Sequence, residues 1–122
     1  MQYMLLIYGD EQGWGGMSDE ERNAVFGDYL AFTSSIRESG NFVDGAPLQP
    51  TGTATSVRVR GGEQLITDGP FAETKEQLGG FYLVEAENVD EAIGLAARIP
   101  GARYGTIEVR PVMPMGAEVA SA

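Results

Sequence analysis

The order of the predicted strands and helices constrains the fold of this chain more than any other feature. Residues 3–9, "YMLLIYG", form a continuous apolar run, which is typical of a central strand buried on both faces. A helix follows, and residues 41–50 return as a short strand. A second unit runs from the strand "GFYLVEA" through another helix to the strand "ARYGTIEVRPV". Two β-α-β units with both helices on one face of a sheet predict a ferredoxin-like α+β fold.

The first helix carries clear signals at its ends. Ser18 and Glu21 have the spacing of a capping box, which satisfies backbone N–H groups at a helix start. Gly40 is a typical helix stop. Between these ends an apolar stripe recurs at helical spacing and predicts one face packed on the core; it consists of Val25, Tyr29, Phe32 and Ile36.

The second helix and the strand before it are equally well marked. Asn88 is the predicted N-cap, Glu91 forms a box-like pair with it, and Pro100 ends the helix. In the preceding strand, alternation predicts that one face carries Phe81, Leu83 and Glu85 and the other Tyr82, Val84 and Ala86. Since helices cover only one face of the sheet, we expect a second copy to cover the other face, giving a homodimer.

A β-hairpin is predicted between the two β-α-β units. In "TATSVRVRGGEQLITDG", Val57 and Val59 alternate with polar residues, and Gly61-Gly62 supplies the turn. The loop that follows contains Phe71, which we expect to anchor the loop in the core. The sequence therefore predicts a hairpin inserted into the ferredoxin-like fold.

Composition excludes several classes of function. A length of 122 residues suggests one domain, which we assign to residues 1–112, with a flexible C-terminal tail at 113–122. A net charge of −10 disfavours nucleic acid and anionic membranes as partners. The chain has no Cys and no His, so thiolate chemistry and His-based metal sites are excluded, and we predict no metal and no cofactor. No apolar run is long enough for a membrane span or signal peptide, which predicts a cytoplasmic protein.

Five stretches of the chain resemble a known family. They are "YMLLIYGDE", "TATSVRVR", "TDGPFAETKEQLGGFYLVE", "DEAIGLAARIP" and "GTIEVRPV", and together they run from residue 1 to about 112. On these motifs the chain resembles the YCII-related family, in particular its DGPF-containing branch. The resemblance implies that ferredoxin-like subunits pair into a dimeric α/β barrel. It attaches no reaction to the chain.

The resemblance also bears on one candidate catalytic residue. Other members of the wider family carry a His on the first long helix and an Asp nearby, suspected as a catalytic pair. This chain has no His, so that pair cannot be carried over. By helix register Tyr29 stands near the His position, which makes Tyr29 a candidate catalytic residue.

The charged stretch after the hairpin supplies further candidates. Asp68 is a candidate polar or acid-base group, although the "DGP" turn accounts for Asp68 without any function, because Asp accepts backbone hydrogen bonds in such turns. Lys75, the only lysine, lies among three acids and is a candidate ligand-binding residue. An ordinary surface ion pair of Lys75 with Glu73 or Glu76 is the simpler explanation.

Three more residues are candidate ligand-binding groups. Tyr8 ends the first strand and Tyr82 lies in a later one, and tyrosines often line the mouth of a wet cavity, although most are core or interface residues. Arg58 and Arg60 share one face of the hairpin and could clamp a carboxylate or phosphate, although an exposed strand face or a dimer contact is the favoured explanation. Glu108 and Arg110 share a strand face, where a plain ion pair is expected.

Two classes of function stay open on this reading, and the sequence does not decide whether the chain is an enzyme. The first is a dimeric α/β-barrel protein that binds or transforms a small molecule in a cleft near the DGPF loop, using Asp68 and tyrosines. The alternative is a non-catalytic regulatory or protein-partner module linked to transcription, since the DGPF branch resembles accessory domains encoded beside sigma factors. An inactive enzymatic remnant is a third reading.

Overall fold

A computed structural model describes residues 1–115 of the chain. The elements of this part are, in chain order, β1 (Gln2–Gly9), α1 (Glu11–Gly15), α2 (Asp19–Glu38), β2 (Phe42–Pro47), η1 (Thr51–Thr53), β3 (Thr55–Arg60), β4 (Glu63–Asp68), β5 (Gln77–Glu85), α3 (Val89–Arg98), η2 (Pro100–Arg103) and β6 (Thr106–Pro111). Most of the tail predicted at 113–122 lies outside the described residues. No helix within residues 1–115 combines the length and apolar character needed to cross a membrane.

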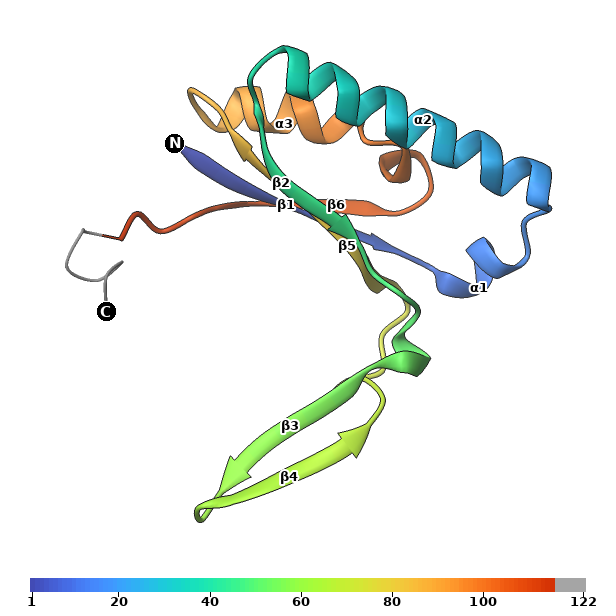
Figure 1. The fold of residues 1–122 in the computed structure, drawn as a ribbon, viewed down its shortest axis with the longest axis vertical. Coiled ribbons are helices and arrows are strands. Elements are labelled where there is room, and N and C mark those ends of the chain that lie inside the picture. The colour runs from blue at the N-terminus through green and yellow to red at the C-terminus, as the bar shows by residue number, and fades with distance from the viewer. Residues whose placement is uncertain (116–122) are drawn as a thin grey trace.

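Four strands form one antiparallel sheet in the order β2-β5-β1-β6. The long helix α2 and the shorter α3 both cover the same face of this sheet, and the other face carries no helix (Figure 1). β1 occupies a central position, as its apolar run predicts. The architecture is therefore α+β and fits the ferredoxin-like topology expected from the order of the elements.

The core lies between the sheet and the two helices. It consists of Tyr3, Leu5, Phe32, Ile36, Tyr82, Val84, Ala86, Ala92, Leu95, Ala96 and Ile99. The apolar stripe of α2 is confirmed, because Phe32 and Ile36 are in this core, Val25 is buried beside it and Tyr29 packs against its edge. The alternation in β5 is confirmed as well, since the residues on one of its two faces are buried in this core.

The helix ends follow the predicted capping, with one exception. At the start of α2, the Ser18 hydroxyl accepts a hydrogen bond from the Glu21 N–H at 3.1 Å, and the Glu21 carboxylate accepts one from the Ser18 N–H at 3.2 Å. Asn88 caps α3 by accepting from the Glu91 N–H at 2.9 Å. The box-like pair predicted there is wrong, because the Glu91 carboxylate accepts instead from the Asn41 side chain at 2.8 Å.

Strands β3 and β4 pair only with each other and form a two-stranded sheet that projects from the body (Figure 1). Gly61 and Gly62 make the turn with φ of 57° and 80°, values that glycine adopts without strain. We call residues 55–75 the arm and the other described residues the body. All residues of the arm are exposed except Ser56 and Gly69, which are half-buried. The predicted core position of Phe71 is wrong: its side chain is 81% exposed, because the arm extends away from the sheet.

Candidate functional site

The helix-free face of the four-stranded sheet, here called the open face, has a mixed surface of apolar and polar side chains. Strand alternation and register place on it Met4, Leu6 and Tyr8 of β1, Phe81 and Leu83 of β5, and Glu108 and Arg110 of β6. All of these are half-buried except Arg110, which is exposed. The continuous burial on both faces predicted for β1 is therefore wrong for the single chain, since its fully buried residues, Tyr3 and Leu5, both lie on the helix side.

Three polar side chains on the open face form one connected group. The Arg110 guanidinium donates a hydrogen bond to Glu108 Oε2 at 2.8 Å, which confirms the predicted ion pair. This bond raises the pKa of Arg110 above its ordinary value, so the guanidinium stays charged. The Tyr8 hydroxyl donates to Glu108 Oε1 at 3.5 Å, longer than the ~2.7 Å of a strong O–H···O bond. Tyr8 and Glu108 therefore keep hydrogen-bonding capacity for a ligand.

The end of the sheet from which the arm projects is held by a network centred on Glu11, which sequence reasoning did not select. The Glu11 carboxylate accepts hydrogen bonds from the Thr51 N–H at 2.7 Å and the Thr51 hydroxyl at 2.8 Å. The Glu11 N–H donates to the Gln77 side-chain oxygen at 3.0 Å, and Gln77 in turn donates to the Thr74 carbonyl. Because Thr51 precedes the arm and Thr74 is among its last residues, Glu11 ties both ends of the arm to the body.

The arm carries three of the predicted site residues, and it leaves them exposed. Asp68 ends β4, and its carboxylate accepts no hydrogen bond from residues 1–115; the turn is fixed instead by Gly69 N–H donating to the Ala54 carbonyl at 2.7 Å. Arg58 lies on β3, and Lys75 lies at the end of the arm. The ion pair expected for Lys75 does not form within the described chain, where the Glu76 carboxylate accepts from a threonine of β6.

Tyr29 and Tyr82 lie on the helix-covered side of the sheet. Tyr29 Oη accepts a hydrogen bond from the Gly101 N–H at 3.1 Å. Burial raises the pKa of the Tyr29 phenol more than the Gly101 bond lowers it, and nearby Tyr82 and Arg103 contribute smaller opposing effects. The Tyr82 hydroxyl is 2.7 Å from the Thr33 hydroxyl. Both phenols are thus close together within the packing between α2 and the sheet.

The six predicted site residues therefore fall into three groups. Tyr8 lies on the open face beside Glu108, Tyr29 and Tyr82 lie on the helix-covered side of the sheet, and the remaining three are on the arm. The single chain does not bring these groups together, because the sheet separates the first from the second and the arm projects away from both (Figure 1).

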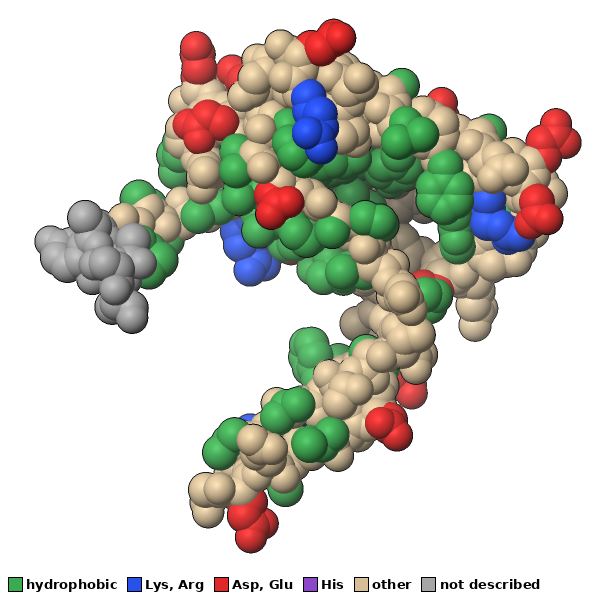
Figure 2. All heavy atoms as spheres, in the orientation of Figure 1, with side chains coloured by type: hydrophobic (Ala, Val, Ile, Leu, Met, Phe, Trp, Pro, Cys, Tyr) green, Lys and Arg blue, Asp and Glu red, His purple; other side chains and the backbone are tan. Residues whose placement is uncertain are grey.

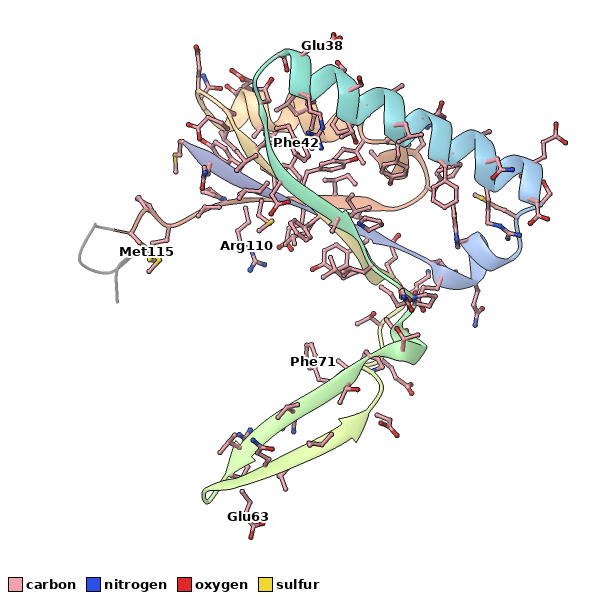
Figure 3. All side chains as sticks on the ribbon, viewed as in Figure 1. Glu38, Phe42, Glu63, Phe71, Arg110 and Met115 are labelled. Atoms are coloured by element: carbon pink, nitrogen blue, oxygen red, sulfur yellow. The ribbon has the colours of Figure 1, made fainter. Side chains whose placement is uncertain are left out.

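The open face and the arm border a concave side of the molecule. Hydrophobic side chains gather both along the sheet and along the arm where they face this concavity (Figure 2). Arg110 extends from the sheet toward the concavity, and Phe71 extends toward it from near the base of the arm (Figure 3). A charged donor and an aromatic ring thus border the same open space.

Two shallow hollows lie at the other end of the sheet. They have volumes of about 300 and 390 Å³, and both adjoin Met1 and Glu85, which pair at the sheet end opposite the arm. Glu87 and Glu91 also line the smaller hollow, so it is acidic and open to solvent. Within residues 1–115 no group of three or more acidic side chains is arranged to hold a metal ion. Neither hollow contains one of the predicted site residues.

The fold and site define a small α+β domain with an apolar sheet face that carries a few polar groups. The YCII-related domain model matches residues 1–116, so the chain belongs to the YCII-related family. An uncharacterized protein of Rhizobium meliloti (strain 1021) is 41% identical over 114 residues, which are 92% of each chain.

A solved structure shares this fold. It is the 5-chloro-2-hydroxyhydroquinone dehydrochlorinase TftG of Burkholderia phenoliruptrix, in complex with 2,5-dihydroxybenzoquinone. The TM-score is 0.55, and the match covers 93% of this chain and 94% of that one. The sequence identity is 16%, so this likeness establishes the fold alone.

Proposed function

We propose that the protein is a homodimer, in which two open faces pack into a dimeric α/β barrel, and that a small molecule binds or is transformed over the open face next to the arm. The observation that carries the proposal is the polar group of Tyr8, Glu108 and Arg110 set into a half-exposed apolar surface. Small-molecule sites are typically apolar with a few placed polar groups that orient the ligand.

The exposed surface of the single chain supports the dimer. The chain exposes 8483 Å² at a mass of 13.0 kDa, whereas a compact folded monomer of this mass exposes roughly 6300 Å². The excess is roughly 2100 Å². The seven residues outside the described range can account for roughly 900 Å² of it at most, which is the exposed area of a fully extended chain of that length. The remainder exceeds the ~800 Å² that each partner buries in a standard interface.

The polar group also indicates the class of ligand. Arg110 offers a charged donor for a carboxylate or an acidic hydroxyl, while Glu108 offers an acceptor for a ligand hydroxyl. Met4, Leu6 and Phe81 supply apolar contact for a hydrocarbon ring or chain. The ligand is therefore a small, partly apolar compound with at least one oxygen that is acidic or hydroxylic.

The fold comparison is consistent with such a ligand. TftG, which shares the fold, acts on a chlorinated hydroxyhydroquinone and holds 2,5-dihydroxybenzoquinone in its solved complex. This is an analogy at the level of the fold, because one fold can host many unrelated functions, and it serves here to choose the compounds to be tested. Tyr29 and Tyr82 lie on the opposite side of the sheet and are not part of the proposed cleft.

Calorimetric titration tests the ligand site. Small hydroxylated aromatic acids and quinones, including 2,5-dihydroxybenzoquinone, are titrated into the wild-type protein and into Arg110→Gln. We expect at least one compound to bind the wild type, and Arg110→Gln to bind it roughly 10- to 150-fold more weakly, because a charged hydrogen bond is lost. Arg98→Gln is the matched control, since Arg98 donates to Ser35 on the helix side, and it should bind normally.

Two results would contradict the proposal. If the wild type binds no compound of the panel, the open face is not a site for this class of ligand. If Arg110→Gln binds as tightly as the wild type, the polar group of the open face is not part of the site. Sedimentation velocity checks the dimer independently and should give twice the 13.0 kDa chain mass.

A further inference from the structure

We infer that the arm of each subunit packs against the body of the other subunit, so that each ligand cleft combines the open face of one copy with the arm of its partner. This inference rests on the proposed homodimer and adds the contact that completes its site. It would also explain why candidate residues on the sheet and on the arm stay apart within a single chain.

The arm has an apolar face that no other part of residues 1–115 covers. Val57 pairs with Ile66, and Val59 lies two residues along on the same face of the ribbon. These side chains are 59%, 63% and 59% exposed. A two-stranded ribbon is at best marginally stable alone in water, and a hydrophobic face packed on another surface stabilises it. The arm therefore gains most from a surface outside its own chain.

The body of the same chain is poorly placed to supply that surface. Glu11 hydrogen bonds to Thr51 before the arm and, through Gln77, connects to Thr74 within its last residues. With both ends fixed, the arm projects from the body and leaves the concave side open (Figure 1). A second copy, already expected on the open face, reaches the same concave side.

Charge favours a contact between the arm and another body. The arm contains the basic residues Arg58, Arg60 and Lys75 and the same number of acidic residues, Glu63, Asp68 and Glu73, so its net charge is zero. The whole net charge of −10 consequently lies on the rest of the chain. An arm therefore approaches a partner body without adding net repulsion to the dimer.

The basic residues of the arm are also available for a partner. The ion pairs within residues 1–115 include none of Arg58, Arg60 and Lys75. In the packed dimer Phe71 fills apolar space beside the partner's open face. Strand alternation places Arg58 and Arg60 on the ribbon face opposite Val57 and Val59, so these two cations lie at the rim of the contact. The arm thus contributes both the apolar wall and the basic rim of a cleft that the sheet alone leaves open.

Photo-cross-linking with mixed isotopes tests the contact. Because the chain has no cysteine, Val59→Cys provides one attachment point for a benzophenone maleimide on an exposed arm side chain. The Val59→Cys protein, carrying benzophenone and the natural nitrogen isotope, is mixed with ¹⁵N wild-type protein. The mixture is irradiated and digested. We expect cross-linked peptides that join residue 59 of the unlabelled chain to body residues of the ¹⁵N chain. Glu38→Cys, at the exposed C-terminal end of α2, is the control and should give no such peptides (Figure 3).

The outcomes separate this inference from the proposed homodimer. Cross-links only within one chain, or only between two arms, in a protein that sediments as a dimer would overturn the inference and leave the homodimer intact. A monomer at every concentration would overturn both. As a second measurement, Ile66→Asp should weaken dimerisation roughly 10- to 100-fold while the circular dichroism of the monomer stays unchanged, because Ile66 is exposed in the single chain. Unchanged dimerisation would contradict the inference.

Discussion

The body and the arm use the same residue types for opposite purposes. In the body, Leu5, Ile36 and Val84 are completely buried between the sheet and the helices. In the arm, Val57 and Ile66 have equally apolar side chains on a regular strand pair, yet they remain largely exposed. Burial rather than composition decides where the folding free energy of this chain originates. The apolar face of the arm can contribute only when another molecule covers it.

Two isoleucines test this difference directly and should give the largest effect. Ile36→Ala removes a completely buried side chain and should lower the free energy of unfolding by about 2–5 kcal/mol, through lost burial and the cavity left behind. Ile66→Ala makes the same chemical change at an exposed position and should alter it by less than about 0.5 kcal/mol in the monomer. Urea unfolding monitored by circular dichroism measures both.

Protein concentration sharpens the same comparison. The effect of Ile36→Ala should be the same at every concentration, because the core belongs to one chain. The effect of Ile66→Ala should grow at concentrations where the dimer forms, since stability is then linked to association. A concentration-independent loss of several kcal/mol for Ile66→Ala would show that the arm packs on its own body.

Tyr29 offers a smaller, pH-dependent test within the body. Tyr29→Phe leaves the Gly101 N–H without its acceptor and should cost about 1 kcal/mol near neutral pH. Burial raises the pKa of Tyr29 above its ordinary 10.0, so the folded state holds the proton more tightly than the unfolded state. The stability gained from the neutral phenol is therefore complete below pH 10 and is lost as the pH rises toward the folded pKa.

Unfolding at a series of alkaline pH values measures this dependence. The wild type should lose stability more steeply above pH 10 than Tyr29→Phe, so the difference between them shrinks. Tyr104→Phe is the control, because the Tyr104 side chain is exposed. A parallel pH profile for the wild type and Tyr29→Phe would show that burial of this phenol does not couple to folding.

Much of the body could be predicted from the sequence, because its patterns are local. The apolar stripe of α2 predicts which face of the helix is buried, and the alternation of β5 separates its two faces. In the structure the stripe of α2 and one face of β5 are buried. The capping signal at Ser18 is similarly contained within four residues. The sequence does not predict helix α1, since residues 10–17 are rich in glycine and only the Asp10 cap indicates a helix.

The placement of the arm could not be predicted, because alternation identifies a ribbon without saying what covers it. Phe71 shows the consequence: a large aromatic side chain suggests a core, yet the structure exposes it. The division of the candidate site between sheet and arm could not be predicted for the same reason. The sequence predicts Tyr8 and Asp68 in one cleft, whereas the structure places Tyr8 on the open face of the sheet and Asp68 on the projecting arm.

One glycine within α2 and one just after its C-terminal end complete the comparison with the smallest expected effect. A Cβ at Gly27 would meet no atom within 4 Å, so close packing does not explain this residue. Gly27→Ala should raise the free energy of unfolding by roughly 0.5–1 kcal/mol, because alanine favours the helix. Gly40→Ala is the matched control and should lower it, since Gly40 has φ of 80°. If Gly27→Ala instead destabilises the dimer while stabilising the monomer, the outer face of α2 contacts the partner, which would contradict an interface confined to the open face and the arm.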